Sequence, residues 1–136
     1  MRSRKFRALL LAPLVVLLMA AGPLLVNPEP IPVPAGLSEK AVSQAVRVGV
    51  AKRGWIVTTQ DPGYLEATLH LRSHMAKIGV TYDTQSVRIN YLESTNLDYV
   101  VKKDGAHIHG NYLKWVENVV RDISVQLNLA EAQSPE

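Results

Sequence analysis

The chain contains no cysteine among its 136 residues. This absence excludes disulfide scaffolds, thiolate zinc sites, iron–sulfur clusters, cysteine nucleophiles and lipidation through an N-terminal cysteine. The sequence also has no Walker, Rossmann, G-x-S-x-G or H-E-x-x-H pattern, and its four histidines are scattered. We therefore expect no metal, no cofactor and no enzymatic activity.

The body of the chain lacks an excess of positive charge, although the whole chain has a formal charge of +3. Four of the fifteen basic residues lie between Arg2 and Arg7, before any acidic residue. From Ala8 onward eleven Lys and Arg stand against twelve Asp and Glu. No basic stripe remains to follow a phosphate backbone, so no nucleic-acid partner is expected.

The basic start is followed by an apolar run, Ala8–Val26, without a charged or polar side chain. Two interpretations of residues 1–26 stay open. A cleaved signal peptide would use the small residues near Ala20 and Ala21, whereas an uncleaved membrane anchor needs about 17–25 apolar residues. We favour the anchor, with membrane contact through residues 8–26. In both cases the positive-inside rule places residues 27–136 outside the cytoplasm, in the cell envelope on the periplasmic side of the inner membrane or free in the periplasm.

Residues 27–36 contain alternate prolines, which favour polyproline II. We expect a poorly ordered Pro-rich linker here, a single domain over residues 37–130, and a frayed tail over 131–136.

The domain begins with a helix predicted over residues 38–53. Ser38 is a good N-cap, Leu37 can pack on Val42, and Gly54 is a natural residue after the helix end. Period-two alternation then predicts antiparallel strands. It makes Leu69 and Leu71 core residues and turns His70 and Arg72 to solvent. The predicted strands are 55–59, 65–72, 76–82 and 87–91.

A last helix is predicted from Ile108 to Leu129, because apolar residues recur there at steps of three and four. Trp115 lies in the middle of this stripe and is expected to be buried. The predicted fold is α+β: a helix, an antiparallel meander of three to four strands, and a helix, with both helices on one face of the sheet.

The strings Tyr91-Leu-Glu-Ser-Thr-Asn-Leu-Asp-Tyr99 and Ile108-His-Gly-Asn-Tyr-Leu-Lys-Trp-Val-Glu-Asn118 carry a resemblance, together with Gly54-Trp55 and Arg72-Ser-His74. Over residues 38–125 the chain resembles a family of small bacterial envelope proteins usually described as lipoproteins of unknown function. The resemblance implies an exported α–β–α domain and no established activity. This chain departs from the family because it has no lipobox cysteine.

Two regions are candidate binding sites. Ser94, Asn96, His109 and Asn111 would form a ligand pocket where the last helix meets the Ser94–Tyr99 loop. The structural alternative is that Ser94 and Asn96 satisfy loop backbone, while His109 or Asn111 caps the helix. The second candidate is a partner surface on the solvent-facing side of the sheet, with His70, Arg72, Lys77 and Arg88. The alternative is that this side is an ordinary solvated sheet face.

These patterns favour a non-enzymatic interaction or structural module of the bacterial cell envelope, with an envelope protein or glycan as its partner. The alternative is a small-ligand or polysaccharide-binding protein that uses residues 94–115. A hydrolase built from Ser94, Asp98 and His109 is the weakest hypothesis, because no nucleophile motif supports it.

Overall fold

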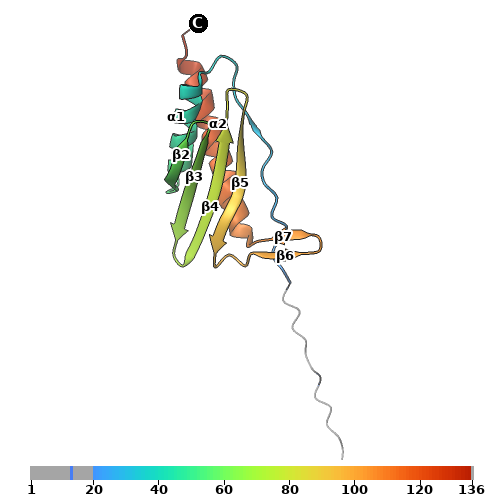
Figure 1. Ribbon diagram of the computed structural model, residues 1–136. Coiled ribbons are helices and arrows are strands. Elements are labelled where there is room, and N and C mark those ends of the chain that lie inside the picture. The colour runs from blue at the N-terminus through green and yellow to red at the C-terminus, as the bar shows by residue number, and fades with distance from the viewer. Residues whose placement is uncertain (1–12, 14–19, 136) are drawn as a thin grey trace, which may run out of the picture.

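The computed structural model describes Pro13 and residues 20–135. A five-stranded antiparallel sheet has the strand order β1-β5-β4-β3-β2, and a separate hairpin pairs β6 with β7. Figure 1 shows a two-layer molecule in which α1 and α2 lie side by side behind the sheet. The predicted α+β class and helix–meander–helix order are confirmed. The elements are β1 (Ile31–Pro32), α1 (Glu39–Ala51), β2 (Ile56–Asp61), β3 (Tyr64–Leu71), β4 (His74–Tyr82), β5 (Ser86–Thr95), β6 (Val100–Lys102), β7 (Gly105–His107) and α2 (Gly110–Gln133).

Helix α1 forms where its caps and apolar face predict it. The Ser38 side chain accepts a 3.1 Å hydrogen bond from the Ala41 amide, which satisfies one free donor of the first turn. Leu37 is buried in the same core as Val42. After the helix the chain reverses at Gly54, whose φ of +89° is readily adopted only by glycine.

The sheet buries one face against the helices. Antiparallel pairing places Leu65 opposite Val80, Ala67 opposite Ile78 and Leu69 opposite Ala76. These six side chains are buried, so the alternation of β3 and β4 gives one core face and one open face as predicted. We call the face away from the helices the open face.

The predicted burial of Leu71 is wrong, because the alternation stops at the end of β3. Arg72 and Ser73 form the turn to β4, and Arg72 adopts a left-handed φ of +56°. Leu71 is therefore the last residue of its strand and is 44% exposed. Arg72 belongs to the turn instead of the open face.

Helix α2 packs its apolar stripe on α1 and the sheet. The closest approach is at Gly49, where an added Cβ would lie 2.7 Å from the Ile123 Cα. Trp115, which we expected to be buried, is only half-buried, while Tyr112 one turn earlier is 2% exposed. The buried residues of α2 are Tyr112, Val116, Val119, Asp122, Ile123 and Leu127.

The Pro-rich stretch, expected to be a poorly ordered linker, is bonded along the edge of β5 over part of its length. Strand β1 pairs Ile31 with Val87, and the Val33 amide donates to the Gln85 carbonyl. The Asn27 Oδ1 accepts from the Tyr91 amide at 3.0 Å. The folded contacts thus begin before residue 37, and they extend back to Gly22, whose carbonyl contacts the His107 ring.

Most of the predicted membrane segment lies outside the described residues, which include only Pro13 and residues 20–26 of it. Within the described part of the chain, no helix is both long and apolar enough to cross a membrane.

Candidate functional site

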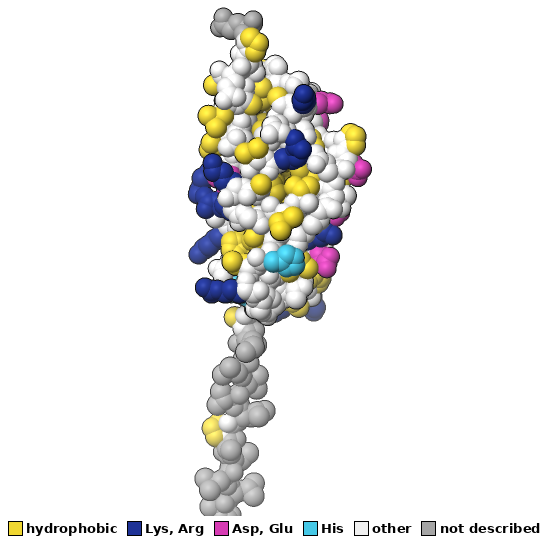
Figure 2. Space-filling model, turned by 90° about the vertical axis from the view of Figure 1, so that its left-hand side faces the viewer, with side chains coloured by type: hydrophobic (Ala, Val, Ile, Leu, Met, Phe, Trp, Pro, Cys, Tyr) yellow, Lys and Arg dark blue, Asp and Glu magenta, His cyan; other side chains and the backbone are white. Residues whose placement is uncertain are grey.

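The open face is the broadest polar surface that the fold leaves uncovered. Strand pairing sets Glu66 beside Gly79, Thr68 beside Lys77, and Thr81 beside Arg88. Sheet pleating turns all of these side chains away from the helices. In the view from the side of α1 and β2, by contrast, single apolar side chains are scattered among charged ones (Figure 2).

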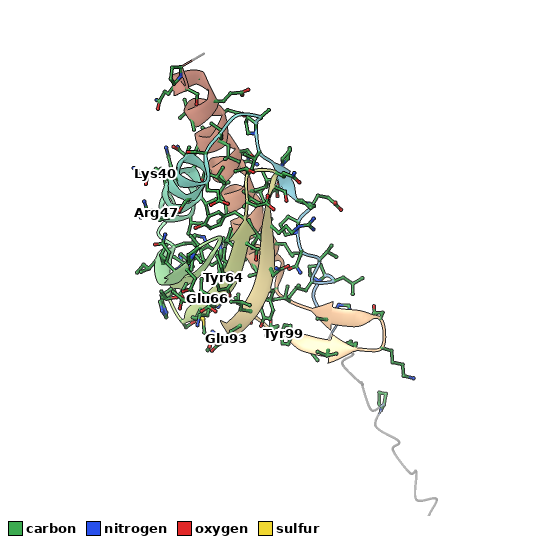
Figure 3. The ribbon with its side chains drawn as sticks, turned by 45° about the horizontal axis from the view of Figure 1, so that its top comes forward. Lys40, Arg47, Tyr64, Glu66, Glu93 and Tyr99 are labelled. Carbon is green, nitrogen blue, oxygen red and sulfur yellow. The ribbon has the colours of Figure 1, made fainter. Side chains whose placement is uncertain are left out.

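A hydrogen-bonded cluster of Tyr64, Glu66 and Lys77 occupies the middle of the open face. The Tyr64 hydroxyl donates to Glu66 Oε1 at 2.9 Å, and Lys77 Nζ lies 3.2 Å from Glu66 Oε2. Figure 3 shows Tyr64 and Glu66 close together on the sheet. The hydrogen bond from Tyr64, followed by that from Lys77, lowers the pKa of Glu66. The carboxylate is therefore ionised at neutral pH and holds both partners in place.

Gly79 makes room for this cluster. A Cβ at Gly79 would lie 3.1 Å from the Tyr64 hydroxyl and 3.4 Å from Leu92 Cδ1. The Tyr64 side chain therefore lies across the strand at Gly79. Leu92 reaches the same spot because a bulge in β5 inserts it between Tyr91 and Glu93, which pair with Ile78 and Lys77.

Three of the four predicted partner-surface residues share this face. Lys77 belongs to the cluster, while His70 and Arg88 are exposed beside it on β3 and β5. Arg72 is the exception, because it forms the β3–β4 turn. Sequence reasoning did not single out Tyr64 or Gly79, whose roles depend on cross-strand pairing.

The four predicted ligand residues lie near the start of α2, and their polar groups bond to nearby structure. Ser94 Oγ is 2.7 Å from the Tyr91 hydroxyl, and Asn96 Nδ2 donates to Ser73 Oγ at 2.8 Å. His109 is the N-cap of α2, and its Nδ1 accepts from the Asn111 amide at 3.1 Å. The cap by His109 agrees with the structural alternative, whereas the Ser94 and Asn96 side chains bond to other side chains and not to loop backbone.

The same bonds bear on the hydrolase hypothesis. In the described part of the chain no hydrogen bond joins Ser94 to His109: Ser94 Oγ bonds to the Tyr91 hydroxyl, and His109 Nδ1 accepts from the Asn111 amide. The region instead serves to attach the loop to the helix, because the His109 amide donates to the Leu97 carbonyl at 2.8 Å.

A small cleft of about 100 Å³ lies beside this region, one turn further along α2. Both tryptophans of the chain line it. At one side Arg53 Nε donates to Asp122 Oδ2 at 2.8 Å, and the His74 ring lies 6.3 Å from the Trp115 ring between centroids. No local sequence pattern predicts this cleft, because three separate segments line it. Its lining residues are Arg53, Trp55, Leu69, Leu71, Trp115 and Asn118.

In the described residues, no three His, Asp or Glu side chains come together to hold a metal ion. No protein-family model, curated protein or solved structure matches the chain. The chemistry of its surfaces is thus the basis for any functional proposal.

Proposed function

We propose that the protein is a non-enzymatic interaction module of the bacterial cell envelope, exported through residues 1–26 and held by them on the outer side of the inner membrane. The basic start, Arg2–Arg7, and the apolar run after it support export in this orientation. The resemblance to small envelope proteins fits the same location. The open face is the proposed contact surface for an envelope protein.

The observation that carries this proposal is the ordered cluster on the open face. Tyr64, Glu66 and Lys77 hold one another in place, so a partner would meet donors and acceptors that are already arranged. Two exposed apolar side chains, Ile56 and Leu92, accompany the cluster on the same face. Tyrosine is enriched in protein interfaces, and Glu66 and Lys77 suit the polar rim of one.

In-cell photo-cross-linking tests the contact surface. A photo-reactive amino acid placed at Thr81 on the open face should give a discrete adduct in the envelope. The matched control is the same amino acid at Arg47, which is exposed on α1 in the other layer of the molecule (Figure 3). Lys77→Glu should remove the Thr81 adduct, because it places a second carboxylate beside Glu66. The fold should persist, since the ion pair is partly exposed and pairs at the surface contribute about 1 kcal/mol or less. Equal adducts at both positions, or none at Thr81, would reject the open face.

The small cleft lined by Trp55 and Trp115, which we call the tryptophan cleft, supports a second candidate function, the binding of a saccharide or small ligand. The half-buried Trp115 ring offers an apolar face, and the Arg53 and Asn118 side chains offer hydrogen bonds at the rim. Because both tryptophans line the cleft, tryptophan emission excited selectively at long wavelength reports on it. Titration with soluble envelope glycan fragments should shift the emission if the cleft is a binding site. Emission that stays unchanged across the fragments would reject this candidate.

A further inference from the structure

Exposed apolar side chains gather at one end of the molecule. Two belong to the N-terminal segment, and three belong to β6 or the residue before it. Their exposed fractions run from 40% to 68%, although large apolar side chains are usually covered when several lie together. The five are Leu24, Val26, Tyr99, Val100 and Val101. We call this group, with the β6–β7 hairpin that carries it, the hairpin end.

Hydrogen bonds join the two parts of the hairpin end into one unit. Leu24 forms an isolated β-bridge with His107, and the Leu25 amide donates to the Ala106 carbonyl at 2.7 Å. The Ile108 amide donates to the Pro23 carbonyl at 3.1 Å. Gly22 packs so closely that an added Cβ would lie 2.5 Å from the Ile108 oxygen. The chain therefore reaches the fold at Gly22 in a fixed position.

His107 adds a charged connection between these parts. Its Nδ1 lies 2.6 Å from the Gly22 carbonyl oxygen, and its Nε2 lies 2.8 Å from Asp104 Oδ1. Both neighbours are acceptors, so both ring nitrogens donate at once only in the imidazolium form, which these contacts favour. In that form His107 balances Asp104. The exposed Lys102 and Lys103 at the hairpin tip then give the hairpin end a net positive charge.

The length of the apolar sequence before Gly22 decides what this end faces. If residues 8–26 hold the protein in a membrane, the part before the bonded segment is residues 8–21, which number 14. A helix of that length is about 21 Å long, whereas the hydrocarbon layer is about 30 Å thick. Gly22 would then be drawn to the membrane surface, and the hairpin end with it.

We propose that the hairpin end lies in the headgroup layer of an anionic membrane, with Val101 at the apolar boundary, Lys102 and Lys103 on lipid phosphates, and Tyr99, whose ring stacks on Tyr91, at headgroup level. This inference rests on the proposed membrane anchor. Figure 1 shows the hairpin projecting sideways from the body beside the segment at residues 20–25, so it can lie along a surface there. Tyrosine and lysine are the residues expected at such a depth.

Depth-dependent quenching tests the proposal. The chain has no cysteine, so Val101→Cys takes a single fluorescent label. Val125→Cys is the matched control, because Val125 is also an exposed valine but lies in the C-terminal half of α2. The full chain is reconstituted in vesicles of phosphatidylethanolamine and phosphatidylglycerol that contain nitroxide-labelled lipid. The label at position 101 should be quenched at least threefold more than the label at position 125. Replacing Lys102 and Lys103 by Glu should reduce this difference.

The intact mass of the reconstituted protein separates the possible failures. If the N-terminus is intact and position 101 is quenched no more than position 125, the inference is overturned and the anchor stands. A chain processed near Ala21 would overturn the anchor and the inference with it. Disulfide-linked dimers of Val101→Cys at high yield, without lipid quenching, would overturn the inference in favour of contact between two copies.

Discussion

At the scale of single residues, Gly49 sets the distance between the two helices. A Cβ there would lie 2.7 Å from both Cα and Cγ1 of Ile123, and the Cα cannot move without shifting α2. We predict that Gly49→Ala lowers the free energy of unfolding by about 1–3 kcal/mol, because overpacking outweighs the gain in helix propensity. Urea denaturation measures the change. Gly110→Ala is the control, since its Cβ would meet only Pro23 Cγ at 3.9 Å, and it should be neutral or stabilising. Equal effects of the two substitutions would contradict the packing of α1 on α2.

Leu69 and Leu71 also test the structure residue by residue. Leu69 is 7% exposed and Leu71 is 44% exposed, although the sequence pattern predicts the same environment for both. We predict that Leu69→Asp unfolds the domain because it buries a carboxylate among apolar side chains. Leu71→Asp should keep the fold and cost no more than about 1.5 kcal/mol, since water reaches the end of β3. Circular dichroism and urea titration distinguish the two. A Leu71→Asp variant that does not fold would mean that Leu71 is a core residue, as the period-two pattern of the sequence predicts.

At the scale of elements, the short pieces were the ones that sequence could not predict. The helix at 38–53 is predictable because a cap marks its start and its apolar period repeats over several turns. The strands after it are predictable because their alternation repeats over many residues. Strand β1 has two residues and includes a proline, and β6 and β7 have three each, which is too short for a period to appear. The Pro-rich stretch reads as a spacer by composition, but Asn27 and Val33 bond it to β5 and its turn. The cleft between the two tryptophans is lined by three segments that lie far apart in the sequence, so no local pattern predicts it.

The link between the N-terminal segment and the hairpin should depend on pH through His107. Its hydrogen bond to Asp104, followed by that to the Gly22 carbonyl, raises the pKa of His107 above the usual value of about 6.5. The contact thus contributes fully to folding stability at pH values below the pKa of His107 in the unfolded chain. This contribution is lost as the pH rises through the higher pKa of His107 in the folded protein. At acid pH the partner carboxylate matters. The hydrogen bond from His107 lowers the pKa of Asp104, so the contribution of Asp104 to folding stability is lost only as the pH falls through that lowered pKa.

An NMR titration of the His107 ring protons measures this effect. We expect a midpoint above the usual histidine pKa of about 6.5 in the native protein. Asp104→Asn should move the midpoint down, because it removes the largest cause of the raised pKa. A midpoint at or below the ordinary value would mean that His107 does not make these two hydrogen bonds in solution.

At the scale of the whole molecule, the main question is whether the segment before α1 moves with the body. If it does, the direction in which the chain leaves Gly22 fixes how the open face is presented to a partner. Amides in long-lived hydrogen bonds exchange slowly, and those facing solvent exchange fast. We predict slow exchange at Leu25 and Val33, whose amides donate to Ala106 and Gln85. Mass spectrometry or NMR should find them protected to a similar degree as the centre of β5. Asn27→Ala should weaken this protection, because it removes the side chain that accepts from the Tyr91 amide. Exchange at Leu25 and Val33 as fast as in a free peptide would show that the segment is a loose tether. The open face would then have no fixed orientation at the membrane.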